Sequence, residues 1–225
     1  MAIQVQGNAG TTGEVEAQHR ALRVINRPLD VGARGAYSLA QMTGVLAAAT
    51  TGEVFQMRWT DATRLMLLRS VLVSWAVSTT AFVAGVPPQL AMRVARSWTA
   101  DGSGGTAIVF STANTNKKRT SFPLSLLSDT GTRIATTAAL GAGTKTLDTN
   151  RCAMVLGNVA VATATSVLVP PVYLWQRNTA DEYPFVFAQN EGFIIEIVAA
   201  PGTGTSSISA QIEWAEVDPT AITGW

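Results

Sequence analysis

The stretch Phe193-Ile-Ile-Glu-Ile-Val-Ala-Ala-Pro-Gly-Thr-Gly-Thr-Ser-Ser-Ile-Ser-Ala-Gln-Ile-Glu-Trp-Ala-Glu-Val217 has the clearest periodicity in the chain. Apolar residues occupy every second position in its first half and again in its second half, which is typical of strands with one buried face. Pro201-Gly202-Thr203-Gly204 separates the halves and has the composition of a hairpin loop. The pattern predicts a β-hairpin, and because a lone hairpin is only marginally stable, other strands must cover its apolar face.

Strand patterns recur along the rest of the chain, separated by Gly and Pro turns, whereas long helical patterns do not. The longest apolar run, Arg64–Val77, fits a strand that is buried on both faces or bends between two sheets. We expect an all-β fold, an antiparallel β-sandwich or jelly roll. The other expected strands are Ala21–Arg27, Ala36–Met42, Glu53–Trp59, Leu90–Trp98, Ile108–Phe110, Leu124–Leu127, Arg133–Ala139, Met154–Val161, Ser166–Trp175 and Phe185–Phe187.

Residues 1–18 are rich in Gly, Thr and Gln and predict an extended N-terminal arm, followed by a single β domain over residues 19–225. Such an arm either reaches across a neighbouring subunit or is a frayed terminus, and both readings stay open. Trp225 lies beyond the last predicted strand, where a terminal tryptophan can anchor in a neighbour's pocket. The candidate interaction residues are Ile3, Val5, Val15, His19, Arg20 and Trp225.

The composition is unusual in charge: 14% of the residues are charged and 47% are hydrophobic, where about a quarter charged is typical. We therefore expect neighbours to cover part of the surface, with a homo-oligomer, and a trimer in particular, as the favoured state. The formal net charge of +1 provides no field for holding nucleic acid or an anionic membrane. The uncharged stretch Ser70–Met92 is interrupted by Ser, Thr and Pro and predicts a strand pair rather than a membrane span.

Tests for catalytic and metal-binding motifs give no candidate site, and we expect no cofactor, no metal and no enzymatic activity. Asp101-Gly-Ser-Gly-Gly105 has the wrong residue order for a chymotrypsin-like nucleophile segment, and the chain has a single histidine to act as its base. Lys117-Lys-Arg119 predicts a solvated loop tip, and Asp181-Glu182 lacks the alternating oxygen ligands of a calcium loop. The single cysteine, Cys152, excludes an internal disulfide and is expected to be a small buried hydrophobic residue.

Five of the six tryptophans fall within predicted strands, so we expect them to pack in the core. They are Trp59, Trp75, Trp98, Trp175 and Trp214.

Four segments together resemble the small structural proteins of tailed-bacteriophage virions, of the head cement or decoration type. They are Gln6-Gly7 to Arg23-Val24, Ala95–Ala107, Arg133–Ala139, and Gln189–Phe193 leading to Trp214–Val217. The resemblance implies a β-sandwich or jelly-roll subunit, often trimeric, that is assembled in the host cytoplasm and stabilises the exterior of the capsid. Its implied partners are the major capsid protein and copies of itself, with no direct contact to nucleic acid, membrane or small-molecule substrate.

Tail and fibre proteins share such folds, so the fold does not settle the role. The main alternative is a tail or head-fibre component that binds a host surface glycan, with Trp175, Asp181 and Glu182 as its weak candidate site. An enzyme is the least supported function.

Overall fold

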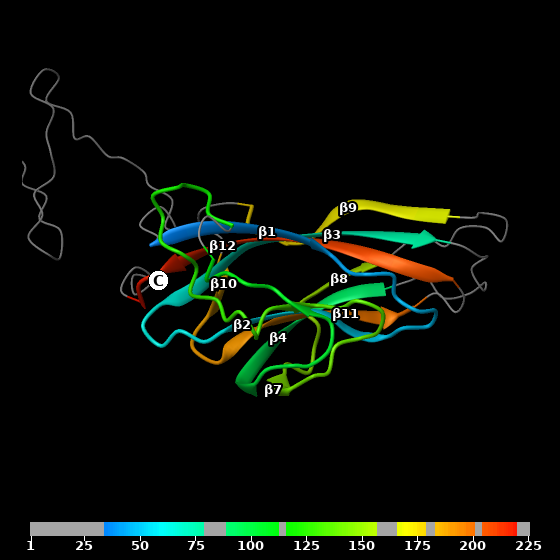
Figure 1. Ribbon diagram of the computed structural model, residues 1–225, viewed down its shortest axis with the longest axis horizontal. Coiled ribbons are helices and arrows are strands. Elements are labelled where there is room, and N and C mark those ends of the chain that lie inside the picture. The colour runs from blue at the N-terminus through cyan, green and yellow to red at the C-terminus, as the bar shows by residue number, and fades with distance from the viewer. Residues whose placement is uncertain are drawn as a thin grey trace, which may run out of the picture.

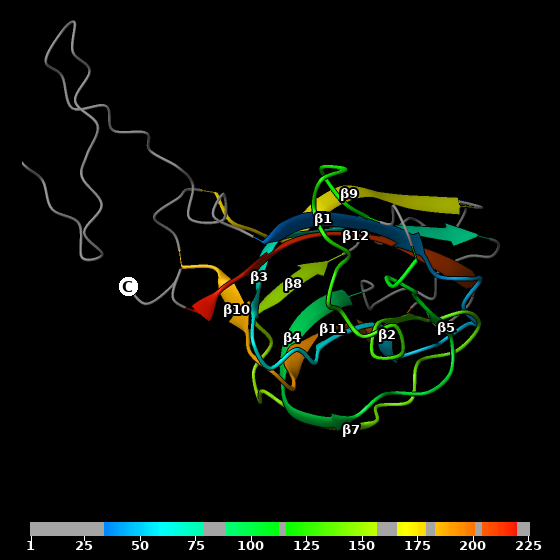
Figure 2. The same cartoon turned by 60° about the vertical axis from the view of Figure 1, so that its left-hand side comes forward.

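The structure is a computed structural model that describes residues 34–78, 89–112, 116–156, 166–178, 183–200 and 204–219. The strands in these ranges pair antiparallel throughout and form two sheets that lie one above the other (Figures 1 and 2). In chain order they are β1 (Gly35–Met42), β2 (Gly52–Trp59), β3 (Leu65–Ser78), β4 (Gln89–Ala100), β5 (Thr106–Ala107), β6 (Arg133–Ile134), β7 (Thr144–Leu147), β8 (Ala153–Leu156), β9 (Ser166–Gln176), β10 (Phe185–Phe187), β11 (Glu191–Ala199) and β12 (Thr205–Val217).

The five-stranded sheet has β12 and β3 at its centre, with β1 beside β12 and both β10 and β9 beside β3. The run predicted over Arg64–Val77 is confirmed as a strand and corresponds to β3, which remains in this one sheet. Its start is buried on both faces at Met66–Leu68, and its later part alternates between buried Val71, Val73 and Trp75 and their partly exposed neighbours.

The seven-stranded sheet has the order β5-β6-β2-β11-β4-β7, and β8 also pairs with β4. Taken with the five-stranded sheet, the main strands read β1-β12-β3-β9 in one sheet and β2-β11-β4-β8 in the other. In chain order these eight main strands alternate between the sheets, except from β4 to β8, and β11 and β12 are inserted between earlier strands. This is the order of a jelly roll, and it confirms the predicted all-β sandwich.

The predicted hairpin between the two halves of Phe193–Val217 is wrong, because β11 and β12 belong to different sheets. β11 pairs with β2 and β4, whereas β12 pairs with β1 and β3. Alternation of apolar residues shows that one face of each strand is buried, but not which strand is its hydrogen-bonded neighbour. Here the two apolar faces contribute to the same core from opposite sides of the sandwich. The stretch Ser70–Met92 has the same arrangement: it runs from β3 to β4, which are strands of opposite sheets.

Two short predicted strands, Ile108–Phe110 and Leu124–Leu127, are wrong, and the strand predicted over Arg133–Ala139 is reduced to β6. Ile108, Phe110 and Leu127 are nevertheless buried. Their segments satisfy backbone amides with side chains rather than with a full strand ladder: Phe110 N–H donates to Asp129 (2.5 Å) and Leu127 N–H donates to Ser125 Oγ (3.2 Å). Apolar residues in these segments indicate burial without indicating a strand.

One core fills the space between the sheets, and aromatic rings from several strands meet in it. The expectation for the tryptophans is confirmed for Trp59, Trp75 and Trp214, each at most 1% exposed in this core, while Trp175 packs against it partly buried. Trp98 is fully buried too, but in a second, smaller cluster with Ala95 and Ile194. Trp214 stacks on Tyr37 with ring centroids 5.3 Å apart and meets Phe110 edge-on at 5.8 Å. Phe193 lies beside both Phe55 and Phe187, with centroids 5.9 and 6.0 Å from its own, so its ring joins residues of both sheets.

We predict that Phe193→Ala lowers the free energy of unfolding by about 3–5 kcal/mol, because it removes a fully buried ring and leaves a cavity between the sheets. Urea denaturation followed by tryptophan fluorescence measures the change. Val45→Ala removes methyl groups from a residue that is 56% exposed and should change the same quantity by less than about 0.5 kcal/mol. Equal effects of the two substitutions would contradict the placement of Phe193 at the centre of the core.

Candidate interaction surface

The interaction residues predicted from the sequence, Ile3, Val5, Val15, His19, Arg20 and Trp225, all lie outside the residues that the structure describes. The predicted arm over residues 1–18, the predicted strand Ala21–Arg27 and the acidic pair Asp181-Glu182 lie outside them too. These expectations stay predictions.

The segment Asp101-Gly-Ser-Gly-Gly105 forms a turn that is tied to the neighbouring loop. Ser103 and Gly141 exchange backbone hydrogen bonds of 3.3 and 2.9 Å. Asp101 accepts a hydrogen bond from Arg58 at 2.6 Å and another from Thr130 at 2.6 Å, so its carboxylate holds the turn in place.

Across the described ranges, no group of three or more His, Cys, Asp or Glu side chains is arranged to hold a metal ion, and no helix is long and apolar enough to cross a membrane.

Cys152 differs from its expected environment, because the residue is exposed rather than buried. It lies immediately before β8, and its Sγ lies 3.2 Å from the carbonyl oxygen of Met92. The predicted basic tip is partly engaged with the domain: Lys118 pairs with Glu213 at 2.7 Å, and the Arg119 guanidinium lies over the Phe122 ring.

The outward side of the seven-stranded sheet and its flanks form a charged face of four cations and four carboxylates that pair with one another. The ion pairs are Lys145–Glu53 (2.7 Å), Arg151–Glu196 (2.8 Å), Arg93–Glu196 (3.8 Å), Arg96–Asp148 (3.0 Å) and Arg96–Glu191 (3.1 Å). Within this group of eight side chains the charges compensate each other.

Lys145 and Glu53 are the most buried pair on the charged face, with side chains 1% and 9% exposed. Gln56 Nε2 donates to the same Glu53 carboxylate at 2.5 Å, and Lys145 Nζ lies 4.5 Å above the centre of the Trp98 ring. Burial raises the pKa of Glu53 and lowers the pKa of Lys145, and the hydrogen bond between them opposes both shifts. The pair links β2 to β7, which is a structural role.

Glu216, near the end of β12, is a fully buried carboxyl group. Ser125 Oγ and the backbone N–H of Leu126 donate to its Oε1 at 2.7 and 2.9 Å, and Arg64 Nη1 lies 3.9 Å from its Oε2. Burial raises the pKa of Glu216, although the two hydrogen bonds favour its ionised form. The carboxyl group therefore attaches the irregular segment around residues 125–126 to the five-stranded sheet.

The outward side of the five-stranded sheet is very different, and we call it the uncharged face. The registers align Ala40, Gln211, Leu72 and Tyr173 in one row across β1, β12, β3 and β9. A second row consists of Met42, Ser209 and Ser74, in which the two serine hydroxyls hydrogen-bond to each other at 2.7 Å. Neither row contains a charged side chain, although the outward faces of antiparallel sheets usually carry polar and charged residues. The next row contains Glu213, which Lys118 neutralises.

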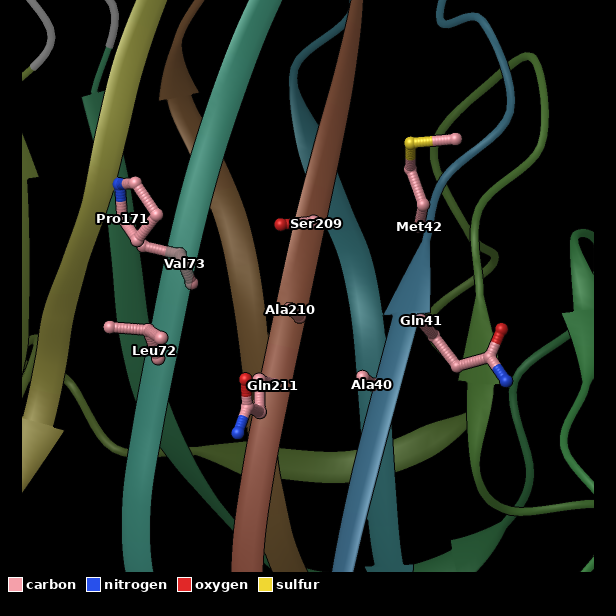
Figure 3. A pocket seen from close by; sticks show the side chains of 9 residues that line it. All are labelled: Ala40, Gln41, Met42, Leu72, Val73, Pro171, Ser209, Ala210 and Gln211. Atoms are coloured by element: carbon pink, nitrogen blue, oxygen red, sulfur yellow. The ribbon is translucent and has the colours of Figure 1, made fainter.

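A shallow groove of about 360 Å³ crosses the uncharged face from β9 to β1 (Figure 3). Pro171, Leu72 and Met42 provide its apolar parts, while Ser209, Gln211 and Gln41 provide polar atoms. Met42 is 64% exposed and Tyr173, in the adjacent row, is 51% exposed. The uncharged face is therefore the described surface best suited to contact another protein through apolar and neutral polar groups.

The sequence contains a signal for this face that the prediction of interaction residues missed. Once Leu39, Ile212 and Val73 are known to point inward, the alternate positions on their strands point outward, and these lack charge over two rows. Of the residues proposed for glycan binding, Trp175 packs edge-on against Phe185 with centroids 5.1 Å apart and is only partly exposed.

Comparison with protein-family models, with curated proteins and with solved structures finds no match to this chain.

We predict that Lys145→Met alone lowers the free energy of unfolding by about 3–5 kcal/mol, because it leaves the Glu53 carboxylate buried without its cation. The double variant Glu53→Gln/Lys145→Met should recover most of this loss. The matched control is the exposed pair Arg34–Asp218, with side chains 57% and 36% exposed, whose coupling in the same double-mutant cycle should stay below about 1 kcal/mol. A coupling free energy of similar size in both double-mutant cycles would contradict the prediction that Lys145 and Glu53 form a buried structural pair.

The raised pKa of Glu216 predicts a specific pH dependence of stability. A carboxyl group whose pKa is higher in the folded than in the unfolded state stabilises the fold fully below its ordinary pKa, and that contribution is lost as the pH rises through the raised value. Glu216→Gln removes this titration, so the stability of the variant relative to wild type should increase as the pH rises above the ordinary pKa of a glutamate, about 4. Denaturant unfolding at several pH values measures the difference, and a difference independent of pH would contradict the prediction.

Proposed function

We propose that the chain is a non-enzymatic structural subunit of a tailed-bacteriophage virion, a cement or decoration protein that stabilises the head by bridging capsomers. Its proposed partners are the major capsid protein on the capsid exterior and further copies of itself, with a trimer favoured. The observation that carries the proposal is the contrast between the two outward faces: the charges of one are neutralised within the subunit, and the other is uncharged over two rows of residues.

The strand order supports the same function at the level of fold. Jelly rolls occur in viral capsid domains, although they also occur in lectins and cupins, so the fold alone does not identify the role. In the described residues the titratable groups with clear partners are engaged in structural contacts, such as Asp101 in its turn and Glu216 beneath residues 125–126. These contacts explain the groups without a reaction.

A cement protein acts mechanically. Pressure from the packaged genome pushes capsomers apart, and a subunit that binds two of them must lose its interface before the shell can open. A standard interface buries on the order of 800 Å² per partner, and many copies act on one shell, so each needs only moderate affinity. An uncharged, firmly hydrogen-bonded sheet suits this role, because its contacts depend little on ionic strength.

The test compares virions with and without this chain. We expect heads that lack it to release DNA at a lower temperature and more readily on dilution, and adding the purified chain back to expanded heads should restore their stability. A dye that fluoresces on binding released DNA, read during a thermal ramp, measures the effect. If the heads keep their stability and the particles instead fail to adsorb to cells, the fibre role replaces the cement role.

A further inference from the structure

We infer that residues Met1–Gly13 of one copy bind across the uncharged face of a neighbouring copy, with Ile3 and Val5 seated in the groove between β9 and β1. The inference rests on the self-association included in the proposed function, and it adds the surface and the segment that bring copies together. It does not depend on where the oligomer sits in a virion.

Charged side chains are absent from both the N-terminal segment and the rows that would receive it. Residues 1–13 contain no Asp, Glu, Lys, Arg or His, and Glu14 is the first charged residue of the chain. The receiving rows, from Ala40 to Tyr173 and from Met42 to Ser74, are uncharged as well. Burying a charge without a partner is costly, so an uncharged segment can cover this face without the desolvation penalty that a charged one would incur.

The N-terminal segment also matches the groove in its pattern of side chains and in its length. Ile3 and Val5 alternate with Gln4 and Gln6, so an extended segment presents both apolar side chains on one side, about 6.7 Å apart. The groove crosses four strands, a width of roughly 15 Å between the outer two, which four or five extended residues can span. Its neutral lining, with Leu72, Met42 and Pro171 beside Ser209 and Gln211, suits apolar side chains flanked by amides.

The chain that precedes the described residues is long enough to reach a neighbouring copy. Residues 1–33 precede the described chain, which begins at the end of the sandwich where Arg34 N–H donates to the carbonyl of Glu216. A chain of this length spans up to about 110 Å when fully extended, whereas the strands of the sheet are shorter than about 50 Å. The segment can therefore extend beyond its own subunit, and the low charged share of the whole chain, 14%, favours a surface covered by neighbours.

Disulfide trapping in the full-length chain tests the contact. In a Cys152→Ser background, Val5→Cys is combined with Gln211→Cys on the uncharged face, and the purified protein is oxidised gently. We expect disulfides between chains, seen as covalent oligomers on a non-reducing gel and assigned by peptide mass spectrometry. The control pair, Val5→Cys with Leu156→Cys, places the second thiol at a residue of β8 that is 56% exposed and off this face, and it should crosslink several-fold less.

Substitution of the receiving face gives a second readout that does not need cysteines. Leu72→Glu introduces a charge into the groove and should lower the oligomer mass measured by light scattering, and Gln211→Glu, at an exposed position, should do the same without disturbing the core. Leu156→Glu makes the same type of change at an exposed site of the other sheet and should leave the mass unchanged. Thermal unfolding verifies that each variant is folded.

Three outcomes would each overturn the inference. The first is that disulfides form only within one chain, and the second is that trapping is no better than with the control pair. The third is that neither substitution in the groove changes the mass of the oligomer. The last outcome would leave a different surface, such as whole sheets stacked against each other, as the contact between copies. The cement role is tested separately on virions, so a failure of the crosslinking experiment does not affect the proposed function. Conversely, heads of unchanged stability would reject the cement role but would not affect a contact trapped by disulfides.

Discussion

The inward side chains of β11 and β12 belong to one core between the two sheets, and the rest of the fold is arranged around these two strands. Each of these strands lies between two others, β11 between β2 and β4 and β12 between β1 and β3. The remaining strands add to β2, β3 or β4 or to strands beyond them. Burial of Phe193, Ile195, Ile212 and Trp214 in this shared core thus holds the two sheets face to face.

Charge is distributed unequally over the outside of this sandwich. One face carries ion pairs that cross strands and neutralise one another, some of them deeply buried, such as Lys145 with Glu53. The opposite face consists of serine, alanine, glutamine and a few apolar side chains, and its one nearby carboxylate, Glu213, is paired with Lys118. A small share of charged residues is therefore used mainly for internal contacts, which leaves the outward side of the five-stranded sheet largely neutral.

Alternation in the sequence was sufficient to predict most of the long strands, because a buried face requires an apolar residue at every second position. It did not predict pairing: β11 and β12 looked like a hairpin, since strands that share a hairpin and strands that face each other across a core have the same pattern. Ile108 and Phe110 looked like a strand because they are buried, but they form no strand ladder: Ile108 N–H donates to the backbone carbonyl of Thr132 and Phe110 N–H donates to the Asp129 side chain. The uncharged face could be recognised only after the structure had shown which alternate positions point outward.

The position of the last two strands has a consequence for how the protein is made. Of the described strands, β11 and β12 come last in the sequence, yet they occupy central places in the two sheets. During synthesis, β1 and β3 have no partner between them, and neither have β2 and β4, until residues 191–217 emerge from the ribosome. Contacts between residues this distant in sequence form slowly, and until they form the edges of the earlier strands can pair with other chains. The sandwich can therefore close only once residues 191–217 have been synthesised, and until then a chain with few charged residues exposes unpaired strands to other chains.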